Sequence, residues 1–430
     1  MDSAAQLART TLLFQVDLDL RDPAVVLRAL TTPSILLVAD EKVVSTLSGQ
    51  VAITTAAMLM ARSGHRVFID VPDAPLTGLQ PPMSGRTLYE AISGVGGQLI
   101  NGVEIAVGCP LFRPDVAFVC GRPEIGMHTK ARRVVSVGWS DWSGEINEWP
   151  MGSRCSNGDW PMGAMAAAVL MASEAVKISG RILTNLSDRS GHLREVFADC
   201  RTARLRLAPE STPKSVGLGR FDIISAGAVS NGFLYALLRL PGLSGRARVF
   251  DQDLSDQTNG NRNMLLVGAL LHLAKVDLFK YFEGGLQIEP VQRHFRKDDL
   301  PSLADVVMVG VDDIPTRWLL AGARASWMGV GATSHFGSMA SVHYPYSACA
   351  ACLHPHDELQ AGPVPTIAFV SFLSGLMVAA DLIREISGAE ASLVSRQRYV
   401  TSLQPAGEFS SPVAPRVDCP AGCPASRLRA

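Results

Sequence analysis

The feature that most constrains this chain is an internal repeat. Apolar segments near positions 66 and 115 recur near positions 248 and 305, at offsets of 182 and 190 residues. An alanine-rich apolar segment also closes each half of the chain. Three matches in the same order predict a duplication, with two halves of the same design. The matched segments are 66–70 with 248–252, 115–121 with 305–311, and 163–176 with 372–383.

Within each half, short apolar runs alternate with helical segments. This alternation is typical of parallel βαβ units whose sheets are covered by helices on both faces. The predicted fold class is therefore α/β, with two Rossmann-like domains in tandem and mostly parallel sheets. The expected strand, helix and strand lie at 34–39, 50–63 and 65–71 in the first half, and at 222–225, 231–240 and 246–251 in the second.

The length of 430 residues suggests two or three domains at about 150 residues each. A segment rich in Pro, Ser and Gly at 208–219 indicates a linker or surface loop between the halves. The sequence therefore predicts domains 1–207 and 208–430.

Composition excludes several classes of protein. Hydrophobic residues make up 47% and charged residues 18%, which excludes a mostly disordered chain. The 39 basic and 40 acidic residues argue against a general nucleic-acid binder. The apolar segment 367–380 is shorter than the roughly 20 residues of a membrane span. The N-terminus has acidic residues where a signal peptide has basic ones. We expect a cytoplasmic protein without membrane partners.

The first strand of the second half leads into a degraded GxGxxG turn, 225–231 (SAGAVSN), with serine at both outer glycine positions. Gly227 would let the backbone approach a phosphate, and Ala228 opens a helix whose N–H groups favour anions. An ordinary tight turn fits these residues equally well. The next strand ends at Asp251 and Asp253, where a carboxylate accepts hydrogen bonds from ribose hydroxyls. A helix cap is the alternative for an isolated Asp.

A more specific pattern follows in DQDLSDQTNGNRN (251–263), a lysine thirteen residues after Arg262, and ADVVMVGVDDIPTR (304–317). In this order and spacing, the chain from Phe221 onward resembles the ThiF/MoeB-type adenylyltransferases, the superfamily of ubiquitin-activating enzymes. The resemblance implies ATP-dependent adenylation by a Rossmann-like adenylation domain. The matching positions are Gly227, Asp251, Asp253, Asn259, Arg262, Lys275 and Asp312.

Adenylation brings a carboxylate and a triphosphate together, so cations must offset their repulsion. Arg262 and Lys275 would stabilise the charge that develops on the phosphates, unless they are ordinary surface cations. Asp312 would hold Mg²⁺, which prefers carboxylate ligands. The pair Asp312 and Asp313 also fits a helix N-cap ahead of Pro315, and both roles can coexist.

Four late cysteines form two pairs, Cys349 with Cys352 and Cys419 with Cys423. Together they would supply four thiolates for a structural zinc, as in zinc-containing members of this superfamily. The alternatives are unpaired thiols, or a site that combines the first pair with His354 and His356.

Many relatives pass the adenylated carboxylate to a cysteine between these pairs, but residues 353–418 contain none. Cys155, next to Arg154, is a weak candidate for a thioester because a neighbouring cation lowers a thiol pKa.

The first half lacks this set of residues. Its turn reads Ala-Asp-Glu-Lys at 39–42, whose acidic side chains would repel phosphate. The resemblance therefore implies an inactive and an active adenylation domain in a pseudo-dimer. In this superfamily an Arg near the N-terminus of the partner domain reaches the ATP phosphates. Arg9 is the candidate, and an ordinary helix-surface arginine is the alternative.

The leading hypothesis is an enzyme that adenylates the C-terminal carboxylate of a ubiquitin-like protein, in a bacterial conjugation or antiviral defence system. A ubiquitin-conjugating-type transfer partner would then be expected. One alternative tailors a small peptide without a thioester, and another is a non-catalytic protein that binds a ubiquitin-like partner. An NAD-dependent dehydrogenase would leave Arg262, Lys275 and Asp312 without a role.

Overall fold

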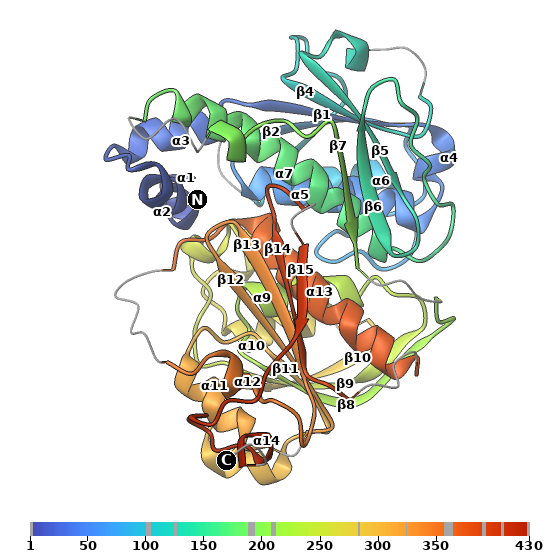
Figure 1. The fold of residues 1–430 in the computed structure, drawn as a ribbon. Coiled ribbons are helices and arrows are strands. Elements are labelled where there is room, and N and C mark those ends of the chain that lie inside the picture. The colour runs from blue at the N-terminus through green and yellow to red at the C-terminus, as the bar shows by residue number, and fades with distance from the viewer. Residues whose placement is uncertain are drawn as a thin grey trace.

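A computed structural model describes residues 3–99, 105–123, 127–187, 194–207, 212–282, 284–323, 325–356, 364–388, 393–405 and 408–427. In this part of the chain, two mostly parallel β-sheets are flanked by helices (Figure 1). The predicted α/β class is confirmed.

The first sheet has the strand order β3-β2-β1-β4-β5-β6-β7. Strands β3 to β5 pair in parallel, and β6 and β7 add an antiparallel edge. The strands are β1 (Ser34–Ala39), β2 (Arg66–Asp70), β3 (Ile105–Val107), β4 (Val116–Cys120), β5 (Arg133–Trp139), β6 (Ser143–Glu148) and β7 (Thr202–Arg206). The helices are α1 (Ser3–Gln6), α2 (Ala8–Leu18), α3 (Pro23–Thr31), α4 (Glu41–Val44), α5 (Leu47–Arg62), α6 (Leu88–Gly96) and α7 (Met162–Thr184).

The second sheet has the order β10-β9-β8-β11-β12-β13-β14-β15, parallel from β10 to β12 and antiparallel beyond. The strands are β8 (Val216–Ile224), β9 (Leu243–Phe250), β10 (Leu286–Val291), β11 (Val306–Val309), β12 (Trp327–Ser334), β13 (Gly337–His343), β14 (Arg396–Thr401) and β15 (Glu408–Pro412). The helices are α9 (Ala228–Leu237), α10 (Lys275–Leu278), α11 (Ile314–Ala321), α12 (Ala350–Leu353), α13 (Ala368–Ile386) and α14 (Pro424–Arg427). Short 3-10 turns include η2 (Gln257–Asn259), η3 (Gly268–Leu270) and η5 (Lys297–Ser302).

The two sheets repeat one topology, because β1 to β7 and β8 to β14 follow the same spatial order. The matched sequence segments fall in β2 and β9, in β4 and β11, and in α7 and α13. The predicted repeat is therefore confirmed at the level of topology. One prediction needs correction: β8 begins at Val216, inside the segment expected to be a linker. Residues 208–211 of that segment lie outside the described part of the chain.

Helices α5, α7, α9 and α13 lie between the two sheets and join them (Figure 1). Every residue of α5 is buried, and small residues let its neighbours approach closely. The α9–α13 crossing shows why glycine is needed there. A Cβ atom on Gly375 would lie 2.3 Å from the Val229 carbonyl oxygen, and one on Gly232 would lie 2.9 Å from the Phe372 Cα. The two halves therefore share one hydrophobic core.

Among the described helices, α7 alone is long and apolar enough to cross a membrane, and 94% of its most apolar window is buried inside the structure. The expectation that 367–380 is the most span-like segment is thus corrected, since that segment lies in α13. The apolar length of α7 follows from its position between the two sheets, where neighbours contact it on all sides.

Candidate nucleotide-binding site

The predicted nucleotide residues gather at the carboxyl ends of three adjacent strands of the second sheet. Gly227 follows β8, Asp251 follows β9 and Asp312 follows β11, and β8 pairs with both of its neighbours. The strand order reverses between β8 and β11. Ligands of open α/β sheets bind in the crevice at such a switch point. The topology therefore places these residues where a nucleotide would bind.

The turn after β8 is already organised by side chains. Ser225 has a φ of 78°, a left-handed conformation that normally favours glycine. Its hydroxyl accepts a hydrogen bond from the Gly227 N–H (3.2 Å), and Asp251 Oδ2 accepts one from the Ala226 N–H (2.7 Å). Helix α9 then begins at Ala228 with no side-chain cap. Its first N–H groups therefore remain available to an anion.

Ser230, the second residue that departs from GxGxxG, faces a glycine on the neighbouring segment. Ser230 stands where a glycine would allow close helix–strand packing, and its Oγ contacts Met308 Sδ at 3.4 Å. On the facing segment, a Cβ atom at Gly310 would lie 2.3 Å from Ser230 Oγ. Gly310 therefore leaves the space that the Ser230 side chain occupies, which lets the two segments approach closely.

Asp253 and Lys275 form an ion pair beside Asp251. Lys275 Nζ lies 2.7 Å from Asp253 Oδ2, and the Lys275 side chain is 13% exposed. The two residues are also joined by a backbone hydrogen bond, from the Lys275 N–H to the Asp253 carbonyl. Asp251 Oδ1 in turn accepts from the Asp253 N–H at 2.8 Å. The structure thus brings Asp251, Asp253 and Lys275 of the predicted set together, and the ion pair between Asp253 and Lys275 is a contact that the sequence did not predict.

Arg262 lies in the segment after η2 and is joined there by a residue from the first half. Burial, and to a smaller extent Arg9, lowers the pKa of Arg262 to about 10, against the opposing effect of Asp256 and Asp312. Burial also lowers the pKa of Arg9, against the opposing effect of Asp256 and Asp312. Two arginines and two carboxylates are therefore close enough to interact electrostatically.

Sequence reasoning missed Asp256, although it stands within the 251–263 run. It caps η2 and forms a reciprocal capping box with Asn259. Asn259 is buried in this turn, where its Oδ1 accepts from the Asp256 N–H at 3.2 Å. Asn259 therefore shapes the segment that carries Arg262, whose guanidinium donates to Thr258 O and to Asn261 Oδ1. A capping box is the signal that would have found Asp256.

Of the two alternatives for the acidic pair after β11, the structure shows the helix cap, and Asp313 forms it. Asp313 is the N-cap of α11 and accepts from the Thr316 N–H at 2.8 Å. Asp312 is exposed and has no hydrogen-bond or ion-pair partner among the described residues. Buried Arg317 braces this loop by donating twice to the Val311 carbonyl, at 2.9 and 2.7 Å. Asp312 therefore keeps its carboxylate available for a cation.

The equivalent switch point of the first half is filled by Asp40. Its carboxylate accepts from the Val43 N–H (2.9 Å) and from the Arg122 N–H (2.6 Å). A Cβ atom at Gly121 would lie 2.5 Å from Asp40 Oδ2. A negative side chain thus occupies the crevice between β1 and β4, where a phosphate would be repelled.

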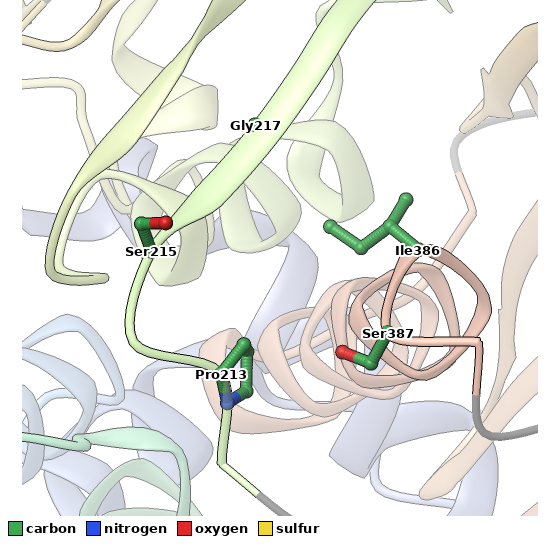
Figure 2. A pocket seen from close by; sticks show the side chains of 5 residues that line it. All are labelled: Pro213, Ser215, Gly217, Ile386 and Ser387. Atoms are coloured by element: carbon green, nitrogen blue, oxygen red, sulfur yellow. The ribbon is translucent and has the colours of Figure 1, made fainter.

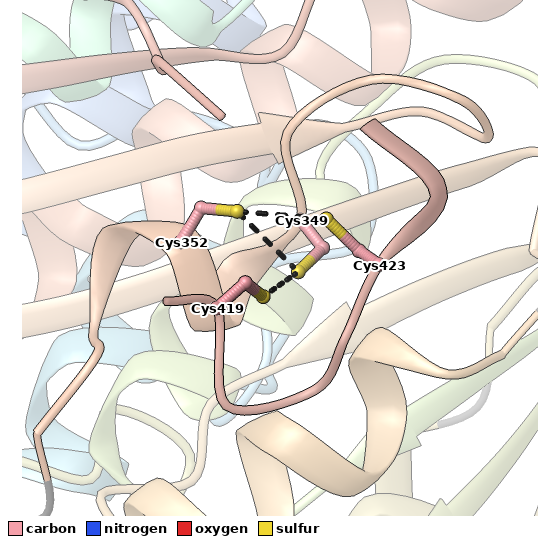
Figure 3. Close-up of side chains that lie close together, drawn as sticks. All are labelled: Cys349, Cys352, Cys419 and Cys423. Atoms are coloured by element: carbon pink, nitrogen blue, oxygen red, sulfur yellow. Dashed lines mark hydrogen bonds between the residues drawn. The ribbon is translucent and has the colours of Figure 1, made fainter. Parts of the chain in front are cut away.

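The four late cysteines converge in a buried cluster (Figure 3). Sγ separations are 3.9 Å for Cys349–Cys352, 3.6 Å for Cys349–Cys419 and 3.6 Å for Cys352–Cys423. Tetrahedral zinc with Zn–S bonds of about 2.3 Å places its sulfurs about 3.8 Å apart. Burial raises the pKa of Cys352 to about 11, so a cation is needed to hold thiolates there. The donor set and spacing fit zinc.

Three of the remaining four cysteines have thiols whose pKa is raised, which disfavours the thiolate. Burial raises the pKa of Cys155 to about 12, with Asp40 and Glu145 acting in the same direction and a backbone hydrogen bond with Gly121 opposing them, so the expected lowering by Arg154 is wrong. Cys120 is fully buried, and burial and the Asp70 carboxylate 2.6 Å away raise the pKa of Cys109 to about 11. Cys200 accepts a hydrogen bond from buried Lys177 at 3.0 Å.

A cavity of about 220 Å³ lies away from these residues, at the far end of α13 (Figure 2). It is lined by Pro213, Ser215, Gly217, Ile386 and Ser387. The lining holds no titratable side chain and none of the predicted nucleotide residues. We therefore assign it no part in the site.

Comparison with known proteins gives one family match. Residues 34–190 match BilD_N, the BilD N-terminal domain. This range runs from β1 to just beyond α7 and covers less than half of the chain. No curated protein matches the sequence.

Solved structures give distant similarity. E. coli MccB with selenomethionine MccA matches at 15% identity over 47% of this chain and 66% of that chain, with a TM-score of 0.41. E. coli MccB with ATP matches at 15% identity over 47% and 67%, also with a TM-score of 0.41. PaaA matches at 15% identity over 46% and 64%, with a TM-score of 0.36. The chain thus spans about two thirds of the MccB chains, and similarity at this level assigns no activity.

Proposed function

We propose that the second half binds ATP and adenylates a carboxylate. The observation that carries this proposal is the cluster of Arg9, Arg262, Asp256 and Asp312 at the switch point between β8 and β11. Arg9 comes from helix α2, far away in the sequence. Positive groups from both halves therefore lie within electrostatic range of Asp312, and α9 begins nearby with an uncapped N-terminus, a combination that suits a triphosphate.

The reaction needs charge compensation more than proton transfer. A carboxylate oxygen attacks the α-phosphorus and forms an O–P bond. The bond to the β-phosphate oxygen breaks, and the electron pair leaves with pyrophosphate. Arg9, Arg262 and Lys275 would offset the negative charge on the phosphates. Asp312 would hold Mg²⁺, which neutralises phosphate charge when bound. Asp251 would accept hydrogen bonds from the ribose.

We further propose a peptide C-terminus as the substrate, without a thioester step. The supporting observation is the state of three of the four cysteines outside the zinc-like cluster. Cys109, Cys120 and Cys155 have pKa values raised above the ordinary range. A thiolate nucleophile needs a lowered pKa and access. An adenylate that reacts directly requires neither.

The second candidate substrate is the C-terminus of a ubiquitin-like protein, with a conjugating-type partner. It is favoured by the fused first half, which repeats the sheet but carries Asp40 at its own switch point. This arrangement resembles the pseudo-dimer of ubiquitin-activating enzymes. Under this reading the protein belongs to a bacterial conjugation or antiviral defence system.

Exchange of labelled pyrophosphate into ATP tests adenylation directly. The purified chain is incubated with peptides, and separately with ubiquitin-like proteins, each carrying a free or an amidated C-terminus. We expect exchange that requires the free carboxylate and falls at least about 100-fold in Asp312→Ala. Exchange supported by peptides favours the first substrate. Exchange supported only by folded proteins favours the second.

The matched control is Asp298→Ala, which removes an exposed carboxylate of η5 that is outside the cluster. It should exchange at the wild-type rate. Failure of the wild-type chain to bind ATP would contradict the proposal. Equal exchange by the Asp312 and Asp298 variants would remove Asp312 from the site.

A further inference from the structure

The segment that carries Arg262 is held in place by a buried arginine of the other half. Arg62, the last residue of α5, is completely buried. One of its terminal nitrogens donates to the Gly260 carbonyl at 2.5 Å. The other donates to Met264 O at 3.2 Å and to Leu266 O at 2.6 Å. A single guanidinium thus bridges both ends of the segment 260–266.

Arg62 forms these contacts at an electrostatic cost. Among the described residues it has no carboxylate partner, because its side-chain hydrogen bonds go to backbone carbonyls. A buried charge without a counter-ion is expensive unless its donors are satisfied. Removing Arg62 would therefore leave three carbonyls of this segment without their donor. The segment would lose the contacts that define its backbone path.

A second contact from the first half reaches Arg262 through one intermediate residue. The Asn261 amide donates to Thr10 Oγ1 at 2.9 Å, and Arg262 donates to Asn261 Oδ1 at 2.9 Å. Thr10 lies in α2, next to Arg9. The backbone adds another link, because the Gly268 N–H donates to the Gln98 carbonyl at 3.0 Å. The Arg262 segment is therefore anchored from the first half as well as from its own half, where Thr366 and Asn231 contact it.

A buried arginine of the second half makes a similar contact with the first half, and it supplies a control. Arg239 follows α9, the counterpart of α5, and is also buried. It donates to the Pro81 carbonyl of the first half at 2.6 Å and to Tyr235 O at 2.9 Å. Pro81 lies after β2, as the Arg262 segment lies after β9. Only the segment held by Arg62 carries predicted nucleotide residues.

We propose that Arg62 is a positioning residue of the first half that holds segment 260–266 so that Arg262 faces the triphosphate of ATP. The proposal rests on the proposed function. It gives the half without nucleotide residues a defined part in nucleotide binding. Arg62 is too deeply buried to touch the nucleotide, so it acts through the segment.

The test measures binding of ATP with Mg²⁺, and of adenosine, to the full chain and its variants by calorimetry and competition. Arg62→Met should weaken ATP binding at least about tenfold but adenosine binding no more than about twofold. The reason is that Arg262 would contact only the phosphates, which adenosine lacks. Arg239→Met should leave both within about twofold of wild type. Arg62→Lys should restore part of the ATP affinity. Both methionine variants should lower the melting temperature, so stability alone does not predict this pattern.

The outcomes separate this inference from the proposed function. A wild-type chain that does not bind ATP refutes the proposed function. A folded Arg62→Met variant that binds ATP like wild type, or that loses ATP and adenosine equally, overturns the inference alone. If Arg62→Met does not fold, Thr10→Val is the deciding variant, because it removes the hydroxyl that accepts from Asn261 and donates to the Thr366 carbonyl. Selective loss of ATP in Thr10→Val supports the anchoring of this segment by the first half, and unchanged ATP affinity overturns it.

Discussion

At the scale of single residues, the contact between Ser230 and Gly310 can be tested by a paired substitution. Gly310→Ala would place a methyl group 2.3 Å from Ser230 Oγ, so we expect a loss of about 1–3 kcal/mol in the free energy of unfolding. Ser230→Ala alone removes only the weak contact to Met308 Sδ and should be nearly neutral. The double variant should recover most of the loss. Denaturant unfolding measures all three, and a double variant as unstable as Gly310→Ala would refute steric compensation.

A buried histidine predicts how stability depends on pH. His65 lies between Met60 O and Ser179 Oγ, and burial lowers its pKa to about 4 from the ordinary value of 6.5. The unfolded chain then binds the proton first as the pH falls. The contribution of neutral His65 to the free energy of unfolding is therefore complete above pH 6.5. It falls by about 3 kcal/mol as the pH drops from 6.5 to about 4.

Unfolding free energies across this pH range test the effect. His65→Asn should flatten the pH dependence relative to wild type. His294→Asn changes an exposed histidine and is the matched control, which should retain the wild-type slope. Identical slopes in all three proteins would show that His65 is not kept neutral by burial.

At the scale of elements, local sequence located some strands well, although β8 begins at Val216 and not at the predicted residue 222. Strand β1 occupies the predicted residues Ser34–Ala39, because a run of apolar residues buried on both faces has a clear pattern. Asp251 and Asp312 also follow the ends of β9 and β11, as the sequence predicted. The roles of Arg62 and Thr10 were not predictable, because their partners lie 198 and 251 residues away. Neither residue belongs to a motif, and only the packing of the halves brings these side chains to the Arg262 segment.

The position of the C-terminal cysteines leads to a prediction about zinc content. Cys419 and Cys423 follow β15 and meet Cys349 and Cys352 at the start of α12, so a metal would join the tail to the second half. The purified protein should contain about one zinc per chain. Cys419→Ser should lose this zinc and melt at a lower temperature, whereas Cys109→Ser, at an exposed thiol, should change neither. Zinc well below one per chain in wild type would refute the site.

At the scale of the whole molecule, the two halves are expected to fold as one unit. Helices α5, α7, α9 and α13 pack against one another between the sheets, and the hydroxyls of Thr55 and Tyr235 are hydrogen-bonded across the halves at 3.0 Å. Arg398 of β14 also links the halves, because it donates to the Arg206 and Leu207 carbonyls of the first half. Separating the halves would expose a large apolar surface on each, which promotes aggregation.

This predicts the behaviour of two fragments, 1–207 and 208–430. Expressed alone, 208–430 should aggregate and fail to bind ATP, because it lacks both the cover of its apolar helices and the first-half residues Arg9, Thr10 and Arg62. Co-expressed, the fragments should form an equimolar complex that melts in a single transition and binds ATP. Light scattering after gel filtration and thermal unfolding measure these properties. If 208–430 alone were monomeric and bound ATP like the intact chain, the first half would be dispensable for the site, and the shared core would be a contact between two independent domains.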